Sequence, residues 1–378
     1  MNIRLNKSLS KTSKIILSTL MVLTGLTFTV NTVLSSAKYP DGATPLHKIN
    51  ASPQNTGKKF TNPRAWKERP SFKTMTEFMF GKNQRTPKAT LPQQTIELSH
   101  FESADTNQLN VTNIGHSSLM INIDGYRILT DPVLEPKLTL LGPTRFNKEI
   151  PLDINQLQDI DYVLISHNHY DHLNKFSIQF LNDRVGHFVV PLAVGAQLEK
   201  WGVPQEQITE LDWWDELQLT DDLLVVATPA QHFSGRGLLD RDKTLWASYV
   251  IGTNQPRVYF GGDSGYFNGF KQIGDKYGPF DITFLECGAY NKGWSFIHMF
   301  PEETAQAALD LQAKYLFPIH WGAFNLSLHD WFDPMQRVKI AAQELGIPLL
   351  TPIFGQTLYY PDDLNTVDWW TPFVTAKP

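Results

Sequence analysis

The segment His167–His172 is the feature that most constrains this chain, because it places three of the eleven histidines and an aspartate within six residues. It reads H-x-H-x-D-H and follows "DYVLIS", a short apolar run with the composition of a buried strand. Its side chains are therefore expected on a loop at the end of a strand. Imidazole and carboxylate are ligands that zinc, manganese and iron accept. Since one ion cannot easily take all four side chains from so short a loop, we predict two metal ions that share it.

Three more candidate ligands follow apolar runs elsewhere in the chain. His232 comes after "LLVVATPAQ", Asp263 after "RVYFGG" and His320 after "YLFPI". A single histidine after a strand is usually a hydrogen-bonded surface or core residue. The repeated pattern favours the other interpretation, in which several strands each deliver one ligand to the same edge of the fold.

The pattern of apolar runs predicts an α/β fold. From residue 110 onward short runs rich in Val, Ile, Phe and Tyr alternate with polar or glycine turns, and the last of them is "PLLTPIFG". Helix-like segments lie between some of the runs, among them "KFSIQFLNDR", "GFKQIGDKYG", "PEETAQAALDLQAKY" and "DPMQRVKIAAQELG". Because these helices are too few to cover every crossover, we expect one sheet packed on another with helices outside.

Composition narrows the class of partner. The formal net charge of −5 provides no basic excess for a polyanion, which argues against nucleic acid as a partner. The single cysteine, Cys287, excludes an internal disulfide framework and a multi-cysteine metal site. The sequence leaves the oligomeric state open, and a homo-oligomer is one of the possibilities.

The N-terminus is typical of export. Four basic residues and no acid precede "IILSTLMVLTGLTFTVNTVL", an uncharged run about one bilayer long, and small residues follow it. We interpret residues 1–37 as an export signal or an uncleaved membrane anchor, with a buried core helix as the alternative. The expected location is therefore periplasmic or membrane-anchored. We expect residues 38–105 to form an extended arm, residues 106–360 the hydrolase domain and residues 361–378 a C-terminal tail.

Taken together, several motifs resemble the metallo-β-lactamase superfamily. They are "GHSSLMINIDGYRILTDPVL", "GPTRF", "DYVLISHNHYDHLN", "DRDKTLWASYVI", "FGGDSGY", "HMFPEETAQAAL" and "IHWGAF", in this order from about residue 112 to residue 324. Within the superfamily they are similar to the branch that includes N-acylphosphatidylethanolamine phospholipase D and its bacterial relatives. The resemblance implies an αβ/βα sandwich, two mixed sheets with outer helices, and a dinuclear site at one edge.

The resemblance also implies a ligand set. One ion would be held by His167, His169 and His232, the other by Asp171, His172 and His320, with Asp263 bridging both. His169 stands where the di-iron redox branch has a glutamate, which favours the hydrolytic branch and two zinc ions. Divalent ions lower the pKa of coordinated water from about 15.7 toward about 7. Asp171 and Asp263 are the predicted catalytic residues, and Asp171 is the candidate that orients this water and moves its proton.

Supporting residues come from the same motifs. His116 and Asp131 are expected to hold ligand side chains by hydrogen bonds, and Asp131 has an alternative interpretation as a turn residue before Pro132. His298 is expected near the substrate or the metal-bound water. Trp294 and Phe296 would either form an apolar wall for an acyl chain or pack in the core.

These observations predict a dinuclear zinc hydrolase. Its expected substrate is a phosphodiester, in particular an N-acylphosphatidylethanolamine-like lipid, with membrane contact as a consequence. The alternative is a lactone or other carboxylic ester, because the same site can attack carbonyl carbon. A non-catalytic metal- or lipid-binding envelope protein is the rival from another class, and it predicts a lost ligand. All seven ligand positions are filled.

Overall fold

The computed structural model describes residues 46–65, 74, 76–77, 81, 83–103, 108–237, 239–252 and 256–374. The predicted export signal or anchor, residues 1–37, lies outside these residues, and the predicted arm, residues 38–105, is described in part. Within the described part of the chain, no helix combines the length and the apolar character needed to cross a bilayer.

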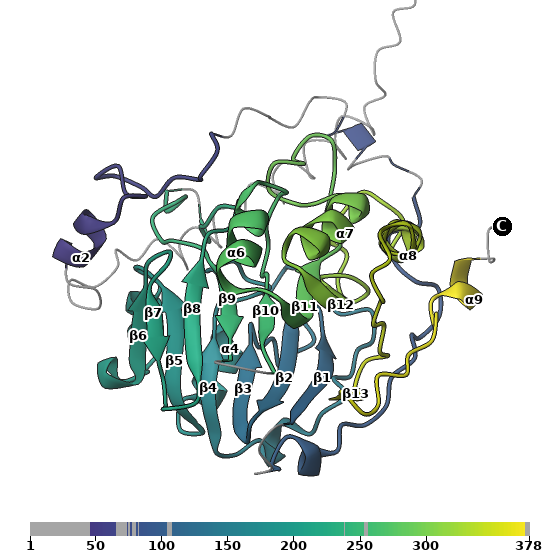
Figure 1. Ribbon diagram of the computed structural model, residues 1–378, viewed down its shortest axis with the longest axis horizontal. Helices are drawn as coiled ribbons and strands as arrows, with labels where there is room; N and C mark the ends of the chain where they lie inside the picture. Colours follow the sequence, from purple (N-terminus) through teal and green to yellow (C-terminus); the bar gives the residue numbers. More distant parts are fainter. Residues whose placement is uncertain are drawn as a thin grey trace, which may run out of the picture.

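Two mixed β-sheets form the centre of the molecule (Figure 1). The strands of the first are β1 (Leu109–Gly115), β2 (Ser118–Ile123), β3 (Tyr126–Thr130), β4 (Ile160–Leu164), β5 (Val185–Pro191), β6 (Ile208–Leu211) and β13 (Thr357–Tyr360), in the order β13-β1-β2-β3-β4-β5-β6. Those of the second are β7 (Glu216–Gln218), β8 (Leu224–Thr228), β9 (Ser248–Ile251), β10 (Val258–Phe260), β11 (Phe280–Glu286) and β12 (Ala313–Ile319), in the order β12-β11-β10-β9-β8-β7. In each sheet an antiparallel part adjoins a parallel part, which comprises β3 to β6 in one and β10 to β12 in the other.

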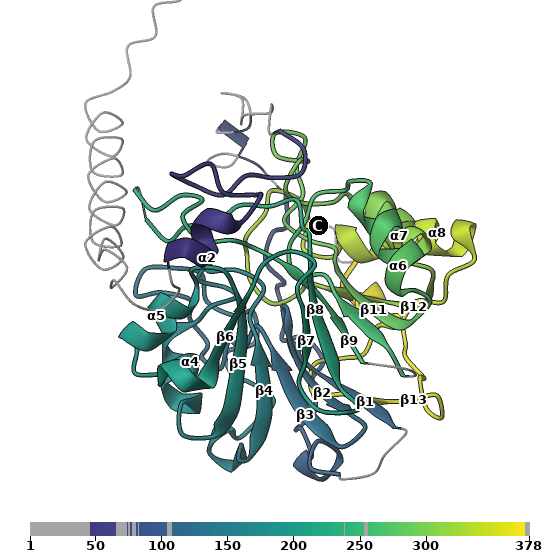
Figure 2. The same ribbon diagram turned by 60° about the vertical axis from the view of Figure 1, so that its left-hand side comes forward.

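Helices cover the outer faces of the two sheets (Figure 2). The α-helices are α2 (Leu46–Ala51), α4 (Lys175–Leu181), α5 (Gly195–Lys200), α6 (Gly269–Tyr277), α7 (Pro301–Asp310), α8 (Asp333–Leu345) and α9 (Thr371–Val374), and the short 3-10 helices are η1 (Leu98–His100), η2 (Ile154–Gln156) and η3 (Gln205–Gln207). Helices α4 and α5 pack on the first sheet, and α6 to α8 pack on the second. The α/β sandwich with outer helices predicted from the sequence is confirmed.

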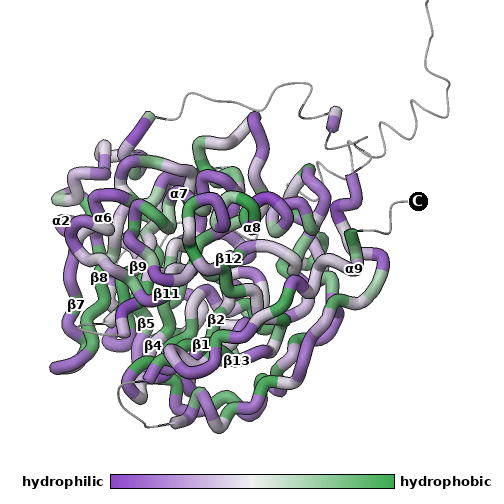
Figure 3. Tube along the Cα trace, turned by 45° about the vertical axis from the view of Figure 1, so that its right-hand side comes forward, coloured by the Kyte–Doolittle hydropathy of each residue, from purple (hydrophilic) through white to green (hydrophobic). Residues whose placement is uncertain are grey.

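The core follows from the alternation of side chains along the strands. In β10, Val258 and Phe260 face the space between the sheets, whereas Tyr259 packs against the helices. In β2, Ile121 faces the other sheet and Met120 faces α4 and α5. Hydrophobic segments run along the strands and hydrophilic ones are frequent in the loops (Figure 3). Both faces of the central strands β2, β9, β10 and β11 are therefore buried, which explains their near-continuous apolar runs in the sequence.

Two sequence-based boundaries were wrong. The helix predicted over residues 301–315 ends at Asp310, because the residues from Ala313 onward pair with β11. The run "PLLTPIFG" is not a strand: it contributes isolated bridges at Leu349 and Phe354, and the strand that pairs with β1 begins at Thr357. In both cases a long-range pairing decided the outcome over the local pattern.

The segments outside the two sheets also contribute buried side chains. Phe60, in the arm, is 2% exposed and belongs to the cluster between the sheets. Leu91 packs on the helix side of the second sheet, where Trp369 and Trp370 of the C-terminal segment also lie. The arm and the C-terminal segment are thus packed parts of the fold.

Candidate metal centre

The sheet topology brings six strand ends to one edge. Because β1, β3 and β4 run in the same direction in the first sheet, and β8, β10 and β12 do so in the second, their carboxyl ends meet there. The residues that follow these ends are His116, Asp131, the segment His167–His172, His232, Asp263 and His320. All seven predicted ligands fall within overlapping groups whose nitrogen and oxygen atoms lie within 4.8 Å of one another. The residues that follow these strand ends therefore lie together, because the strands end at the same edge of the fold.

Asp263 lies at the middle of this cluster. Its Oδ2 atom is 3.2 Å from Nε2 of both His172 and His320. The same atom is 3.7 Å from Nε2 of His232 and 3.9 Å from Nε2 of His167. Asp263 therefore lies between the two predicted ligand sets.

The first predicted set consists of His167, His169 and His232. Nδ1 of His169 lies 2.8 Å from Nε2 of His167 and 3.3 Å from Nε2 of His232. His167 donates its Nδ1 hydrogen to Ser166 Oγ, and His232 donates its own to the carbonyl of Ile297 at 3.0 Å. These bonds leave the Nε2 lone pairs directed into the cluster. The one hydrogen on Nδ1 of His169 cannot bond well to both Nε2 atoms at once, whereas a cation could bind both.

The second predicted set consists of Asp171, His172 and His320. Oδ2 of Asp171 lies 3.5 Å from Nε2 of His172 and 3.3 Å from Nε2 of His320. It also accepts a hydrogen bond of 2.9 Å from Nε2 of His116, which therefore supports a carboxylate. The ring of His116 packs on that of His320 with 4.0 Å between centroids.

Asp131 makes hydrogen bonds with Ser166 and His172, at the start and the end of the histidine loop. Its Oδ2 accepts from Nδ1 of His172 at 2.7 Å and from Oγ of Ser166 at 2.6 Å, while its Oδ1 accepts from the Ser166 amide. Its φ of 37° is positive, and it lies in a bend of the chain. The hydrogen bonds agree with the supporting role expected of Asp131, which stays a prediction.

Burial and charge divide the histidines into two kinds. Burial lowers the pKa of His116 and of His169 to about 3, and it lowers the pKa values of His167 and His232 well below the ordinary range. Burial also opposes charge on His320, but Asp263 and Asp171 outweigh it and raise the pKa to about 10.

The pKa of His172 is shifted in the same direction as that of His320, because the neighbouring carboxylates outweigh burial and raise it. Burial likewise opposes charge on Asp171 and Asp263, yet the histidines around them hold the pKa of each carboxylate well below its ordinary value. Without a metal, protons on His172 and His320 therefore provide the positive charge that the two buried carboxylates require.

The donor set fits divalent metal ions. Nδ1 of His320 and Oδ1 of Asp263 are buried without a hydrogen-bond partner, and Nε2 of His172 and of His320 have only the longer contacts of 3.2 Å to Asp263. Buried polar atoms are normally paired, and incompletely paired ones in a cluster of imidazoles and carboxylates fit the binding of a divalent cation. The cluster contains nitrogen and oxygen donors and no thiolate, which suits zinc in a hydrolytic site.

Glu286 is a residue of this site that the sequence did not reveal. It is fully buried at the end of β11, and its Oε2 accepts from Nδ1 of His298 at 2.7 Å. Burial raises the pKa of Glu286. The His298 ring lies 5.1 Å from that of His232 and 5.5 Å from that of His320. Glu286 thus fixes the ring of His298 at the margin of the cluster.

The two predicted wall residues lie nearby but do not line the pocket next to the cluster. Phe296 is 3% exposed and the guanidinium of Arg64 lies over its ring. Trp294 is half-buried and donates its indole hydrogen to the carbonyl of Ala289. The pocket beside His320 has an enclosed volume of about 20 Å³, and its aromatic lining residues are Trp321, Phe324, His329 and Trp331. A role for Trp294 or Phe296 in substrate binding stays a prediction.

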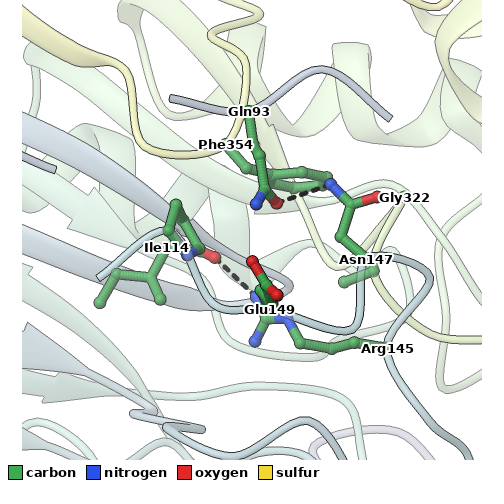
Figure 4. Close-up of a pocket in the computed structure, with 9 residues that line it drawn as sticks. Gln93, Ile114, Arg145, Asn147, Glu149, Gly322 and Phe354 are labelled. Atoms are coloured by element: carbon green, nitrogen blue, oxygen red, sulfur yellow. Dashed lines mark hydrogen bonds between the residues drawn. The ribbon is translucent and has the colours of Figure 1, made fainter. Parts of the chain in front are cut away.

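A second small pocket is lined by Ile114, Arg145 and Gly322, among others (Figure 4). Arg145 is 6% exposed there, and its Nη2 donates to the carbonyl of Ile114 at 2.6 Å. Its guanidinium also lies over the ring of Phe324, which contacts the ring of His116. Burial lowers its pKa to about 10, so it is charged at neutral pH. The motif "GPTRF" pointed to this residue without indicating its role.

The sandwich and the histidine–aspartate cluster at its edge define a metal-dependent hydrolase of the β-lactamase type. Residues 126–321 match the family model described as beta-lactamase superfamily domain. The chain belongs to this superfamily, as its motifs predicted.

Several known proteins are similar to this chain. An uncharacterized protein of Mycobacterium tuberculosis is 44% identical over 291 residues, which cover 75% of this chain and 77% of that protein. N-acyl-phosphatidylethanolamine-hydrolyzing phospholipase D 1 of Caenorhabditis elegans is 31% identical over 317 residues, which cover 76% of this chain and 88% of that protein. The structure of an isothiocyanate hydrolase from Delia radicum gut bacteria has the same fold, with a TM-score of 0.53 and 21% identity over 66% of this chain and 98% of that one.

Proposed function

We propose that the chain is a hydrolase with two zinc ions that cleaves the phosphodiester of an N-acylphosphatidylethanolamine-like lipid, in the manner of a phospholipase D. The observation that carries the proposal is the convergence of two ligand sets on Oδ2 of Asp263. The similarity to the phospholipase of Caenorhabditis elegans supports the choice of substrate class.

The side chains of the cluster have distinct tasks in this proposal. The ions would be held by the two sets described above, and when bound they supply Lewis acidity and make water nucleophilic near neutral pH. Asp171 is placed to orient the attacking water and to accept its proton, because His116 fixes its Oδ2. His298, whose Nδ1 bonds to Glu286, would present its Nε2 to the substrate or to the attacking water.

The pocket beside His320 suits part of an amphipathic substrate. Its enclosed volume of about 20 Å³ is far below that of ligand pockets, which span roughly 300–1,000 Å³, so it can hold only a small part of a substrate. Trp321 and Phe324 offer apolar surface next to the cluster, and Arg85 is the basic residue of the lining. We propose that these side chains contact the lipid part that adjoins the scissile bond, without enclosing it.

We also propose an exported location, periplasmic or anchored by residues 1–37, with residues 106–360 as the hydrolase domain. The basic flank and the apolar run of the N-terminus support this location. Membrane phospholipid would then be accessible as substrate, and the negative net charge gives no support to a nucleic-acid partner.

Hydrolysis by the purified full-length chain in detergent tests the proposal. Zinc-loaded and chelator-treated protein would be compared on N-acylphosphatidylethanolamine, bis(p-nitrophenyl) phosphate, an acyl-homoserine lactone and a penicillin. Zinc-dependent release of phosphatidic acid is the expected result. Turnover of the lactone alone would reassign the site to carbonyl chemistry, and a fully loaded protein inert on every compound would favour a non-catalytic binding protein.

A further inference from the structure

The N-terminal arm reaches the candidate metal centre through residues 60–64, here called the strap. Asn62 in the strap makes two hydrogen bonds with the main chain of His232. Its Oδ1 accepts from the His232 amide at 2.9 Å, and its Nδ2 donates to the His232 carbonyl at 2.6 Å. His232 is fully buried and lies beyond the end of β8, where no strand pairing satisfies its main-chain groups. Asn62 therefore takes the place of a neighbouring strand.

The residue before His232 is held in the same way. The side-chain amide of Gln231 accepts from the amide of Arg64 at 3.2 Å and donates to the carbonyl of Arg64 at 3.0 Å. The main chain of Gln231 is bonded as well. Its amide donates to Ser264 Oγ and its carbonyl accepts from the Gly265 amide, both at 2.9 Å. The strap and the loop that follows Asp263 thus hold this segment from opposite sides.

The strap also reaches the side chain of His232 indirectly. The guanidinium of Arg64 lies 5.1 Å from the ring centre of Phe296. The next residue, Ile297, provides the carbonyl that accepts from Nδ1 of His232. The strap therefore bonds directly to the main chain of His232, and it contacts Phe296, the neighbour of the residue that bonds to the His232 ring.

The strap is itself rigidly attached. Phe60 is buried between the sheets and its amide donates to the carbonyl of Asp242 at 2.7 Å. The amide of Thr61 donates to the carbonyl of Gln54 at 2.9 Å. Because the strap is fixed to the core, its contacts with His232 constrain the ligand and not only the arm.

We propose that Asn62 is a positioning residue for the metal centre, which holds His232 so that its Nε2 faces His169 and Asp263. This inference rests on the proposed function, because it assumes that His232 binds a metal ion. It assigns a task at the site to a residue outside the span that matches the superfamily domain, residues 126–321. Supporting residues that orient a metal ligand typically contribute about 10–100-fold to metal affinity.

The test is a comparison of zinc affinities in the full-length chain, measured by competition with a chromophoric chelator. Asn62→Ala should weaken the binding of one zinc ion by about 10–100-fold. Asn55→Ala is the matched control, because the Asn55 side chain bonds to Ile49 and Gly57 within the described part of the arm and makes no hydrogen bond with Gln231 or His232. The control should keep the affinity of the wild type. If Asn62→Ala does not fold, Asn62→Ser carries the same comparison.

A double variant separates positioning from general destabilisation. In a His232→Ala background, Asn62→Ala should cause no further loss of affinity, because the residue acts through His232. An equal loss in both backgrounds, or wild-type affinity in Asn62→Ala, would overturn the inference. A wild-type chain that binds no zinc would instead refute the proposed function, so the two failures are distinguishable.

Discussion

Asp263 is the single residue on which the proposed site depends most. Its Oδ2 lies within 3.9 Å of four histidine nitrogens, and the negative charge is buried among them. Asp263→Asn keeps the shape but removes the charge that two cations would share. We expect a folded protein whose kcat/KM falls by more than about 100-fold, since a ligand should matter more than a supporting residue. Circular dichroism and steady-state kinetics check this, and full activity in the folded variant would refute the two-metal mechanism.

Glu286 allows a finer test at the same scale. Glu286→Gln keeps an acceptor for His298 but removes the charge that fixes the ring. If His298 donates to substrate, kcat should fall by about 10-fold while zinc content stays at the level of the wild type. Glu216→Gln, at an exposed carboxylate that accepts from Tyr277, is the matched control and should leave kcat unchanged. Loss of zinc in Glu286→Gln would place the residue in the metal site itself.

The sequence revealed the residues of the cluster unequally. His232, Asp263 and His320 were predictable because each follows an apolar run, and strand ends gather at an edge. Glu286 was not predictable, because it belongs to the buried strand β11. Its partner, His298, lies twelve residues later and meets it only when the chain has folded back. A buried acid at the end of an apolar run was the available signal.

At the scale of elements, Arg145 ties the end of β1 to the loop after β3. Its donors satisfy the carbonyls of Ile114 and Val133, and both bonds are buried. Arg145→Met should lower the free energy of unfolding by about 1–3 kcal/mol, because buried carbonyls lose their partners. Arg127→Met, which breaks a half-exposed pair with Asp161, should cost less than about 1 kcal/mol. Urea unfolding measures both, and equal costs would contradict this account of Arg145.

Elements were predictable where local and long-range preferences agree. Helix α8 has Pro334 in its first turn and ends at Leu345, just before Gly346, whose φ of 71° suits glycine. Both signals lie in the sequence. By contrast, β13 pairs with β1 from about 245 residues away, and the local pattern marked residues 348–355 instead. Pairings of this kind depend on the assembled sheet and leave a weak local signature.

At the scale of the whole molecule, the metal-free protein should be most stable near neutral pH. Burial lowers the pKa of His116 and His169 to about 3, so below their ordinary value of 6.5 the unfolded chain binds more protons and stability falls. The pKa of His320 is raised to about 10, so its contribution is complete below 6.5 and is lost as the pH rises through about 10. Urea midpoints of the chelated protein at about pH 5, 7 and 9 check this, and a midpoint that rises steadily from one end to the other would contradict it.

The central claim is that one chain holds two metal ions at the edge of its sandwich. The most direct measurement is the metal content of the purified full-length protein by elemental mass spectrometry, in parallel with the His232→Ala variant. The account predicts close to two divalent ions per chain for the wild type and about one for the variant, because His232 belongs to only one of the two sets. A wild-type protein that saturates with one ion, or with none, would contradict it.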